Sequence, residues 1–150
     1  MTEQTMLQPG ELDRSFKGEQ EEIALFMDCA FLCYERYDYE RALRLYMGAQ
    51  ILDPANVDIH SAIGTTLMQL ERYDDAVTWL SRAMELCPSE ECPYVHVAEM
   101  LIKQGKPAEA RKLLANAQPL VDEGDNAALQ ERLQALMDIT DAILAEQPAD

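Results

Sequence analysis

The side chains best suited to metal binding or nucleophilic chemistry are few in this sequence of 150 residues, which holds four cysteines and two histidines. Cys29 and Cys33 stand four residues apart, and Cys87 and Cys92 flank the short segment PSEE. Structural zinc sites usually present CxxC or HxxxH pairs, and neither spacing occurs in this sequence. We therefore expect the cysteines to pack as small hydrophobic residues and to hold no metal.

The histidines and the remaining motifs predict no catalytic site either. His60 and His96 belong to different predicted helices, with no Ser or Cys motif beside them. The sequence has no GxSxG, GxxxxGK[ST] or HExxH motif and no GxGxxG after a strand. The acidic segments 19–22 and 122–125 lack the ligand pattern of a calcium loop. We predict that the protein is not an enzyme and needs no cofactor.

The elements that position these side chains follow a repeat of 34 residues. Ala42, Ala76 and Ala110 lie one such step apart, and the step continues without insertion through the middle of the chain. A period of 34 residues is that of the tetratricopeptide helix–turn–helix repeat. Five further series share this step: Ala49, Ala83, Ala117; Leu52, Leu86, Leu120; Ala30, Gly64, Ala98; Tyr39, Tyr73, Pro107; and Pro54, Pro88.

The repeat predicts an all-α protein with three tetratricopeptide repeats in a short right-handed solenoid. The repeats cover about residues 23–56, 57–90 and 91–124. Small residues at the repeated positions let the two helices of a repeat approach closely, and Pro54 and Pro88 end the second helices. We expect helices near 22–36, 39–52, 57–70, 74–87, 92–104 and 107–121.

The two ends of the chain fall outside the repeats. Apolar residues on one face of residues 126–146 predict a C-terminal capping helix, because an array needs its last apolar face covered. Residues 1–21 contain Pro9, Gly10 and Gly18 among scattered charges, so we expect a flexible or partner-ordered N-terminal arm. The tetratricopeptide-repeat domain then extends over residues 22–146.

Charge restricts the possible partners. Lys and Arg total 12 and Asp and Glu total 28, which gives a formal net charge of −16. Such a surface repels phosphate backbones and lacks the basic clusters that anionic lipid attracts, so we expect no nucleic acid and no direct membrane binding. No apolar run spans a bilayer, and the segment MTEQTMLQPGELD lacks the features of a signal peptide. We expect a cytoplasmic protein.

Function is then expected on the concave surface of the array, which the first helix of each repeat lines. Helical projection predicts one inward stripe in each repeat. The stripes are Met27, Phe31, Tyr34 and Glu35; Ser61, Thr65, Met68 and Gln69; and Val95, Glu99, Ile102 and Lys103.

The aromatic residues of the first stripe allow two interpretations. Most aromatics at helical spacing belong to a core, but other residues already fill the packing positions of this helix: Phe26, Cys29, Ala30 and Cys33. We therefore place Phe31 and Tyr34 on the open side, where large rings anchor ligands, and Met68 adds apolar surface nearby. A clamp for acidic C-terminal tails is not expected, because Lys103 is the only basic side chain in the stripes.

Two segments carry a resemblance to a known family. AFLCYERYDYERALRLY is similar to a pattern of Ala-Phe, then Tyr, then a second Tyr before the repeat alanine. AEMLIKQGKPAEARKLLANAQPLV resembles the pattern AExLLxxGxxxEA. Both patterns are those of the class II chaperones of bacterial type III secretion, which hold translocator proteins in the cytosol. The resemblance covers about residues 24–145. It implies a groove for a proline- and leucine-containing stretch of the client, and a homodimer formed through the segment before Ile23.

The resemblance also implies which residues touch the client, at Met27, Phe31, Tyr34, Tyr39 and Leu52. The stripes add Thr65, Met68, Glu99 and Ile102 to the predicted peptide-binding set. The chain departs from the family at Leu80, where the family often has an aromatic residue, and at Met27, where a Tyr would be expected, and both departures affect the peptide preference. The predicted function is a cytosolic export chaperone that keeps a hydrophobic translocator protein soluble. The alternative is a scaffold or assembly factor that joins folded partners.

Overall fold

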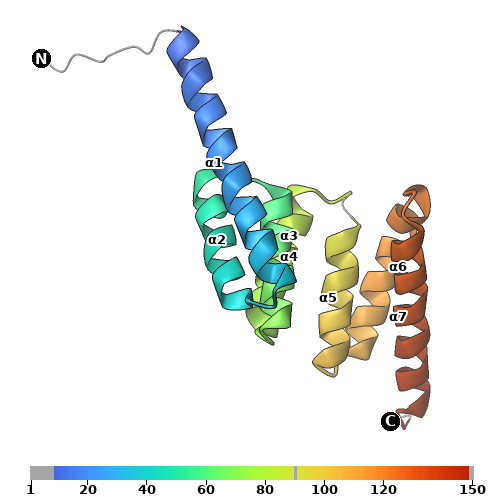
Figure 1. Ribbon diagram of the computed structural model, residues 1–150. Helices are drawn as coiled ribbons and strands as arrows, with labels where there is room; N and C mark the ends of the chain where they lie inside the picture. The colour runs from blue at the N-terminus through green and yellow to red at the C-terminus, as the bar shows by residue number, and fades with distance from the viewer. Residues whose placement is uncertain (1–8, 90, 149–150) are drawn as a thin grey trace, which may run out of the picture. The chain divides into compact units, whose positions relative to one another are not determined.

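The protein is helical throughout the part that the structure describes. The computed structural model describes residues 9–89 and 91–148, with side chains from Gly18 onward, and no strand occurs among them. The helices are α1 (Pro9–Glu35), α2 (Tyr39–Leu52), α3 (Val57–Gln69), α4 (Tyr73–Leu86), α5 (Cys92–Lys103), α6 (Pro107–Glu123) and α7 (Ala127–Glu146) (Figure 1). The predicted all-α repeat fold is confirmed.

The helices belong to two compact units. One unit ends at Pro54 and contains α1 and α2, and the other begins at Ala55 and contains α3 to α7. Within each unit, consecutive helices pack on one another, and α7 also contacts α5. The prediction of a single domain over residues 22–146 stays a prediction.

The turn inside each helix pair has the same backbone geometry at a spacing of 34 residues. Tyr37, Glu71 and Gly105 have positive φ values of 62°, 59° and 75°. The next N–H then donates back to a carbonyl near the end of the first helix, over N–O distances of 2.9, 3.0 and 2.8 Å. This hydrogen bond belongs to the pair of bonds that ends a helix through a left-handed residue. The three donor–acceptor pairs are Asp38 to Cys33, Arg72 to Leu67 and Lys106 to Leu101.

The small residues of the repeat are buried where two helices cross. A Cβ atom at Gly64 would stand 2.7 Å from Cδ2 of Leu80, closer than real Cβ atoms come. Ala30 and Ala98, one step before and after Gly64, have no exposed surface. The backbones of the paired helices therefore approach to a distance at which a larger side chain does not fit.

The C-terminal helix covers the last repeat, as predicted. Leu129, Leu133 and Leu136 of α7 join one buried cluster with residues of α5 and α6, including Val95 and Leu114. At the start of α7, the Asn126 side chain accepts a hydrogen bond from the Leu129 N–H at 3.1 Å, which caps the helix.

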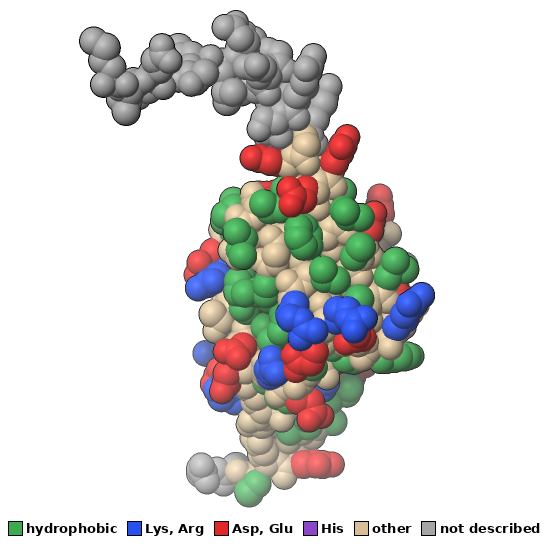
Figure 2. Space-filling view, turned by 60° about the vertical axis from the view of Figure 1, so that its left-hand side comes forward, with side chains coloured by type: hydrophobic (Ala, Val, Ile, Leu, Met, Phe, Trp, Pro, Cys, Tyr) green, Lys and Arg blue, Asp and Glu red, His purple; other side chains and the backbone are tan. Residues whose placement is uncertain are grey.

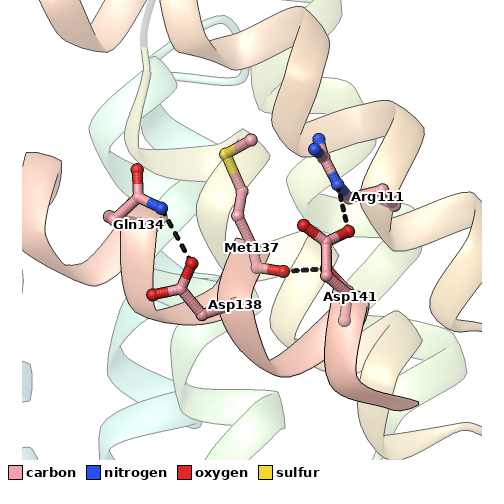
Figure 3. Close-up of polar contacts among 6 residues, drawn as sticks. Arg111, Gln134, Met137, Asp138 and Asp141 are labelled. Atoms are coloured by element: carbon pink, nitrogen blue, oxygen red, sulfur yellow. Dashed lines mark hydrogen bonds and ion pairs between the residues drawn. The ribbon is translucent and has the colours of Figure 1, made fainter. Parts of the chain in front are cut away.

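Polar contacts are made along the second half of α7 (Figure 3). Arg111 of α6 donates to Asp141 at 2.7 Å and so ties α6 to α7 near the far end of the capping helix. Within α7, Gln134 donates to Asp138 at 2.9 Å and Thr140 to the Met137 carbonyl at 2.8 Å. Because Arg111 and Asp141 are both partly exposed, the pair adds at most about 1 kcal/mol to stability.

The start of the first helix differs from the prediction. The expected helix began near residue 22, whereas α1 begins at Pro9, within the segment predicted as a flexible or partner-ordered arm. Proline suits a first helical turn, and no proline lies between Pro9 and Glu35 to end the helix. Gly18 lowers helix stability by only about 1 kcal/mol. Residues 1–8 of the predicted arm lie outside the described residues, and ordering by a partner stays a prediction.

Candidate peptide-binding site

The first helix buries one side and exposes the side on which the sequence predicted ligand contacts. Ala30 is fully buried, and the Phe26 ring lies 3.1 Å from the position that a Cβ on Gly48 of α2 would take. Phe31 is 55% exposed, while Met27 and Tyr34 are partly buried. Phe26 and Ala30 therefore pack against α2, and the Phe31 ring is available to a partner.

Three tyrosines gather where α1 ends and α2 begins. The Tyr34 and Tyr39 rings lie 5.1 Å apart at 69°, and the Tyr37 and Tyr39 rings lie 6.2 Å apart at 89°. Both pairs have the edge-to-face geometry that aromatic rings prefer. Desolvation raises the pKa of Tyr39, and the neighbouring Tyr34 and Tyr37 raise it further, so the Tyr39 ring stays neutral at pH 7. We call Tyr34, Tyr37 and Tyr39 the tyrosine cluster.

Tyr37 is a candidate that the sequence prediction missed. Its side chain is 80% exposed, and its backbone is in the left-handed region that glycine adopts most easily. The 34-residue repeat could have indicated that Tyr37 is a turn residue, because the third repeat has Gly105 at the position where the first repeat has Tyr37.

Leu52 lies far from this cluster within the same unit. It ends α2, whereas Tyr39 begins that helix, so the two are separated by about 20 Å along the helix axis. Leu52 is 36% exposed. The structure therefore brings Tyr34 and Tyr39 together and leaves Leu52 apart from them.

The second unit carries the other predicted contacts, and some of them offer little free surface. Met68 is buried, with 8% of its surface exposed, so it presents less apolar surface than expected. The Thr65 hydroxyl donates to the Ala62 carbonyl of its own helix at 3.1 Å. Ile102 is partly buried against the cluster formed by α5, α6 and α7.

Glu99 is held by two basic side chains. Lys103 lies 3.7 Å from its carboxylate on the same helix, and Arg132 of α7 donates to the other carboxylate oxygen. The sequence placed Glu99 and Lys103 in one stripe but gave no indication of Arg132, because α7 lies outside the 34-residue repeat. Glu99 therefore enters any contact with a ligand as part of an ion-pair network.

A pocket opens beside this network, between α5 and α7. Its volume is about 240 Å³, and its lining residues are Cys92, His96, Asn126, Ala128, Leu129 and Arg132. The Nδ1 atom of His96 is buried and has no hydrogen-bond partner among the residues that the structure describes. Burial lowers the pKa of His96 and Arg132 lowers it further, whereas Glu99 raises it, so the imidazole is neutral at pH 7.

The first unit also has an apolar pocket of about 270 Å³, on α1 and α2. It is lined by Glu22, Leu25, Phe26, Cys29 and Leu45. Cys29 and Cys33, expected at packing positions, are both partly buried. Within residues 18–89 and 91–148, no three His, Cys, Asp or Glu side chains are grouped as a metal site would need.

Exposed apolar side chains are concentrated on the first unit. Of the eight large hydrophobic residues that are exposed in the described part of the chain, six belong to α1, α2 and the turn between them. Figure 2 shows hydrophobic side chains gathered on one face of the molecule, below a group of acidic side chains. The six residues are Leu25, Phe31, Leu32, Tyr37, Ile51 and Leu52.

Comparison with known proteins agrees with this architecture. The family model described as tetratricopeptide repeat matches residues 34–96. The translocator chaperone SycD of Yersinia enterocolitica, solved in complex with a peptide of the translocator YopD, superposes with a TM-score of 0.78. It is 22% identical, and the match covers 83% of this chain and 95% of that one. The fold is that of the type III secretion translocator chaperones.

Two further matches define how far the likeness extends. PcrH of Pseudomonas aeruginosa, solved with the chaperone binding region of PopD, has a TM-score of 0.79 at 18% identity, covering 83% of this chain and 95% of that chain. The STIP1 homolog of Dictyostelium discoideum is 33% identical over 75 residues. Those residues are 50% of this chain and 13% of that protein. Among the described residues, no helix combines the length and the hydropathy that crossing a membrane requires.

Proposed function

We propose that this protein is a cytoplasmic export chaperone that binds an extended segment of a hydrophobic, translocator-type secreted protein. The observation that carries the proposal is the concentration of exposed aromatic and aliphatic side chains on α1 and α2. Exposed apolar side chains concentrated on one part of a protein are a mark of interaction sites. The likeness of the fold to SycD and PcrH, which were solved with translocator segments, supports a client of the same class.

Binding would depend on a few well-placed side chains. An extended peptide loses much conformational entropy when it is ordered, so its affinity must come from side chains that become fully buried. Phe31 and Tyr34 are the anchors we propose, and the further predicted contacts are Met27, Tyr39, Leu52, Thr65, Met68, Glu99 and Ile102. The net charge of −16 would keep the loaded complex soluble. Binding alone accounts for this function, without catalysis or a cofactor.

Self-association belongs to the same proposal. SycD has been solved as an alternative dimer, which supports pairing of the present chain. We propose that the segment before Ile23 contributes to a homodimer. Sedimentation of the full chain over a range of concentrations tests this point independently of the client.

The test of the chaperone proposal replaces both anchors in the double variant Phe31→Ala/Tyr34→Ala. The client is first identified as the protein that co-purifies from the native cell. Each lost anchor should weaken client binding by about 2 kcal/mol, or about thirtyfold in Kd. Phe31→Ala should change thermal stability little, because Phe31 is more exposed than buried, whereas Tyr34→Ala also removes the ring contact with Tyr39, which costs about 0.5–1.5 kcal/mol. Client expressed together with the variant should aggregate.

A matched control is available on the same helix. Leu32→Ala removes a side chain that is 56% exposed and adjacent to Phe31, but on another face of α1. It should leave client binding unchanged. If the control weakens binding as much as the double variant, the proposed face is wrong. If the co-purifying protein is a folded member of a stable complex, the protein is a scaffold and the export role is rejected.

A further inference from the structure

The exposed face of α1 that carries Phe31 also carries negative charge. Ala24, Asp28, Phe31 and Glu35 follow one another at steps of four, three and four residues, so they share one face of the helix, and all four are exposed. Phe31 therefore has a carboxylate one turn away on each side. Among the described residues, neither Asp28 nor Glu35 has an ion-pair partner. A partner that covers the Phe31 ring also meets these two negative charges.

The rest of the helix does not offset this charge. From Gly18 to Glu35, α1 has acidic side chains and no basic one. Glu35 also lies in the last turn, where the helix dipole is negative and a cation would be favoured. A basic side chain supplied by a partner would relieve both sources of repulsion. The acidic residues in this part of α1 are Glu19, Glu21, Glu22, Asp28 and Glu35.

Another exposed face of α1 provides a contrast. Leu32 is as exposed as Phe31, but Asp28 precedes it by one turn and Arg36 follows it by one turn. The charges beside Leu32 thus have both signs, whereas the charged residues one turn from Phe31 are both acidic. Complementary charge steers and selects partners at protein interfaces. The Phe31 face therefore suits an apolar side chain that has basic neighbours.

The spacing of the two carboxylates matches that of an extended peptide. At 1.5 Å per residue along the helix axis, Asp28 lies about 4.5 Å to one side of Phe31 and Glu35 about 6 Å to the other. In an extended segment, residues two apart point to the same side and are separated by about 6.7 Å. An apolar residue on the Phe31 ring therefore brings the residues two before and two after it close to the carboxylates.

We propose that the face of α1 formed by Asp28, Phe31 and Glu35 binds an extended client segment of the pattern basic–x–apolar–x–basic, in which basic is Lys or Arg and x is any residue. The inference rests on the proposed function, because it names the chemistry of the segment that the Phe31 anchor receives. It adds a charge requirement to a contact that the ring alone would leave apolar. The contact weakens as ionic strength rises, because salt screens exposed charge pairs.

Three blocked pentapeptides serve as probes of the charge and of its spacing. Acetyl-Lys-Ser-Leu-Ser-Lys-amide has the proposed pattern, and acetyl-Gln-Ser-Leu-Ser-Gln-amide lacks the charge. Acetyl-Ser-Lys-Leu-Lys-Ser-amide has the composition of the first probe, but its lysines point away from the side that carries the leucine. Each probe is titrated at low salt into the full ¹⁵N-labelled chain, and the amide signals of Asp28, Phe31 and Glu35 are followed by NMR.

The first probe should bind at least about tenfold more tightly than the Gln probe, because it forms two exposed charge pairs. It should bind at least about threefold more tightly than the rearranged lysine probe. Equal binding of the first probe and the Gln probe would refute recognition of charge. Equal binding of the two lysine probes would show only general attraction to an acidic chain, and would overturn the proposed pattern.

The informative variant is Asp28→Asn/Glu35→Gln, which removes both charges at exposed positions and keeps the size of the side chains. Binding of the first probe should fall by about tenfold, and by about threefold for Glu35→Gln alone. Glu22→Gln is the matched control, because Glu22 is exposed but lies nine residues before Phe31 and so on the opposite side of α1. It should bind the probe as the wild type does. Undiminished binding by the double variant would show that the proposed face is wrong.

The charge requirement and the chaperone proposal can fail separately. If the client depends on Phe31 and Tyr34 while Asp28→Asn/Glu35→Gln binds it normally and no lysine probe binds, the charge requirement fails alone. If the first probe binds in the proposed pattern but the co-purifying protein is a folded member of a stable complex, the chaperone proposal fails. The Phe31 face then stands as a site for basic, apolar segments.

Discussion

Two of the three helix turns have a residue other than glycine at the positive-φ position, Tyr37 and Glu71. Replacing each of them by glycine should show whether it affects the stability of the fold, the binding of the client, or both. Tyr37 and Glu71 have φ values of 62° and 59°, which cost an L-residue about 1–2 kcal/mol relative to the right-handed region. Glycine removes this cost but loses more entropy on folding, by about 0.5–1 kcal/mol. For Glu71→Gly, whose side chain is exposed, we expect a net gain of about 1 kcal/mol in unfolding free energy.

Tyr37→Gly should give less, because the Tyr37 ring contacts Tyr39 at 6.2 Å. An edge-to-face pair contributes about 0.5–1.5 kcal/mol, and an exposed one lies near the lower limit, so the net gain should be about half that of Glu71→Gly. Thermal unfolding followed by circular dichroism measures both values. One kcal/mol corresponds to about 2–4 °C in Tm for a chain of this size.

The same two variants test whether the tyrosine cluster has a function. If Tyr37 contacts the client, Tyr37→Gly should be at least as stable as the wild type and yet bind the client about fivefold more weakly, a loss of about 1 kcal/mol. Glu71→Gly should bind as the wild type does. A Glu71→Gly variant with an unchanged or lower Tm would refute the strain argument, and unchanged binding by Tyr37→Gly would remove Tyr37 from the site.

Two further predictions concern the second unit. Gly64→Ala should destabilise the chain by about 1–3 kcal/mol, because the new Cβ would overlap Leu80. Ala62→Gly on the same helix provides a comparison without such an overlap. A Gly64→Ala melting curve equal to that of the wild type would contradict this prediction. Because burial and Arg132 lower the pKa of His96 below its ordinary value of 6.5, with Glu99 acting in the opposite direction, the unfolded chain binds the proton more readily. The stabilising contribution of neutral His96 is therefore complete above pH 6.5 and is lost as the pH falls towards the lowered pKa. In urea titrations, His96→Gln should lose less stability than the wild type between pH 7 and 5. Parallel losses of stability in the two proteins would refute this prediction.

The sequence predicted the repeated helices closely, because the 34-residue period and the apolar stripes both fix their positions. α2 begins and ends at the predicted residues, and the bounds of α3, α4 and α5 differ by one residue. The period gives no information outside the repeats, so the start of α1 was placed too late. It also gave no indication that Arg132 reaches Glu99, because that contact depends on how α7 rotates against α5.

Single side chains of the candidate site were harder to predict than helices. The exposure of Phe31 follows from its place beside the packing positions of α1, which the repeat defines. Met68 occupies the same repeat position as Tyr34 but is buried, because burial depends on the neighbouring side chains as well as on the position. Tyr37 was missed because a turn residue belongs to no helical face.

The common geometry of the three turns has a consequence for how such chains diversify. Tyr37, Glu71 and Gly105 occupy equivalent places, yet the hydrogen bonds around them use backbone atoms alone. A substitution at this place changes the side chain displayed at the tip of a helix pair while the hydrogen bonds that form the turn are kept. Each repeat thus has one position at which selection can alter surface recognition at the cost of a small local strain, without redesigning the interior.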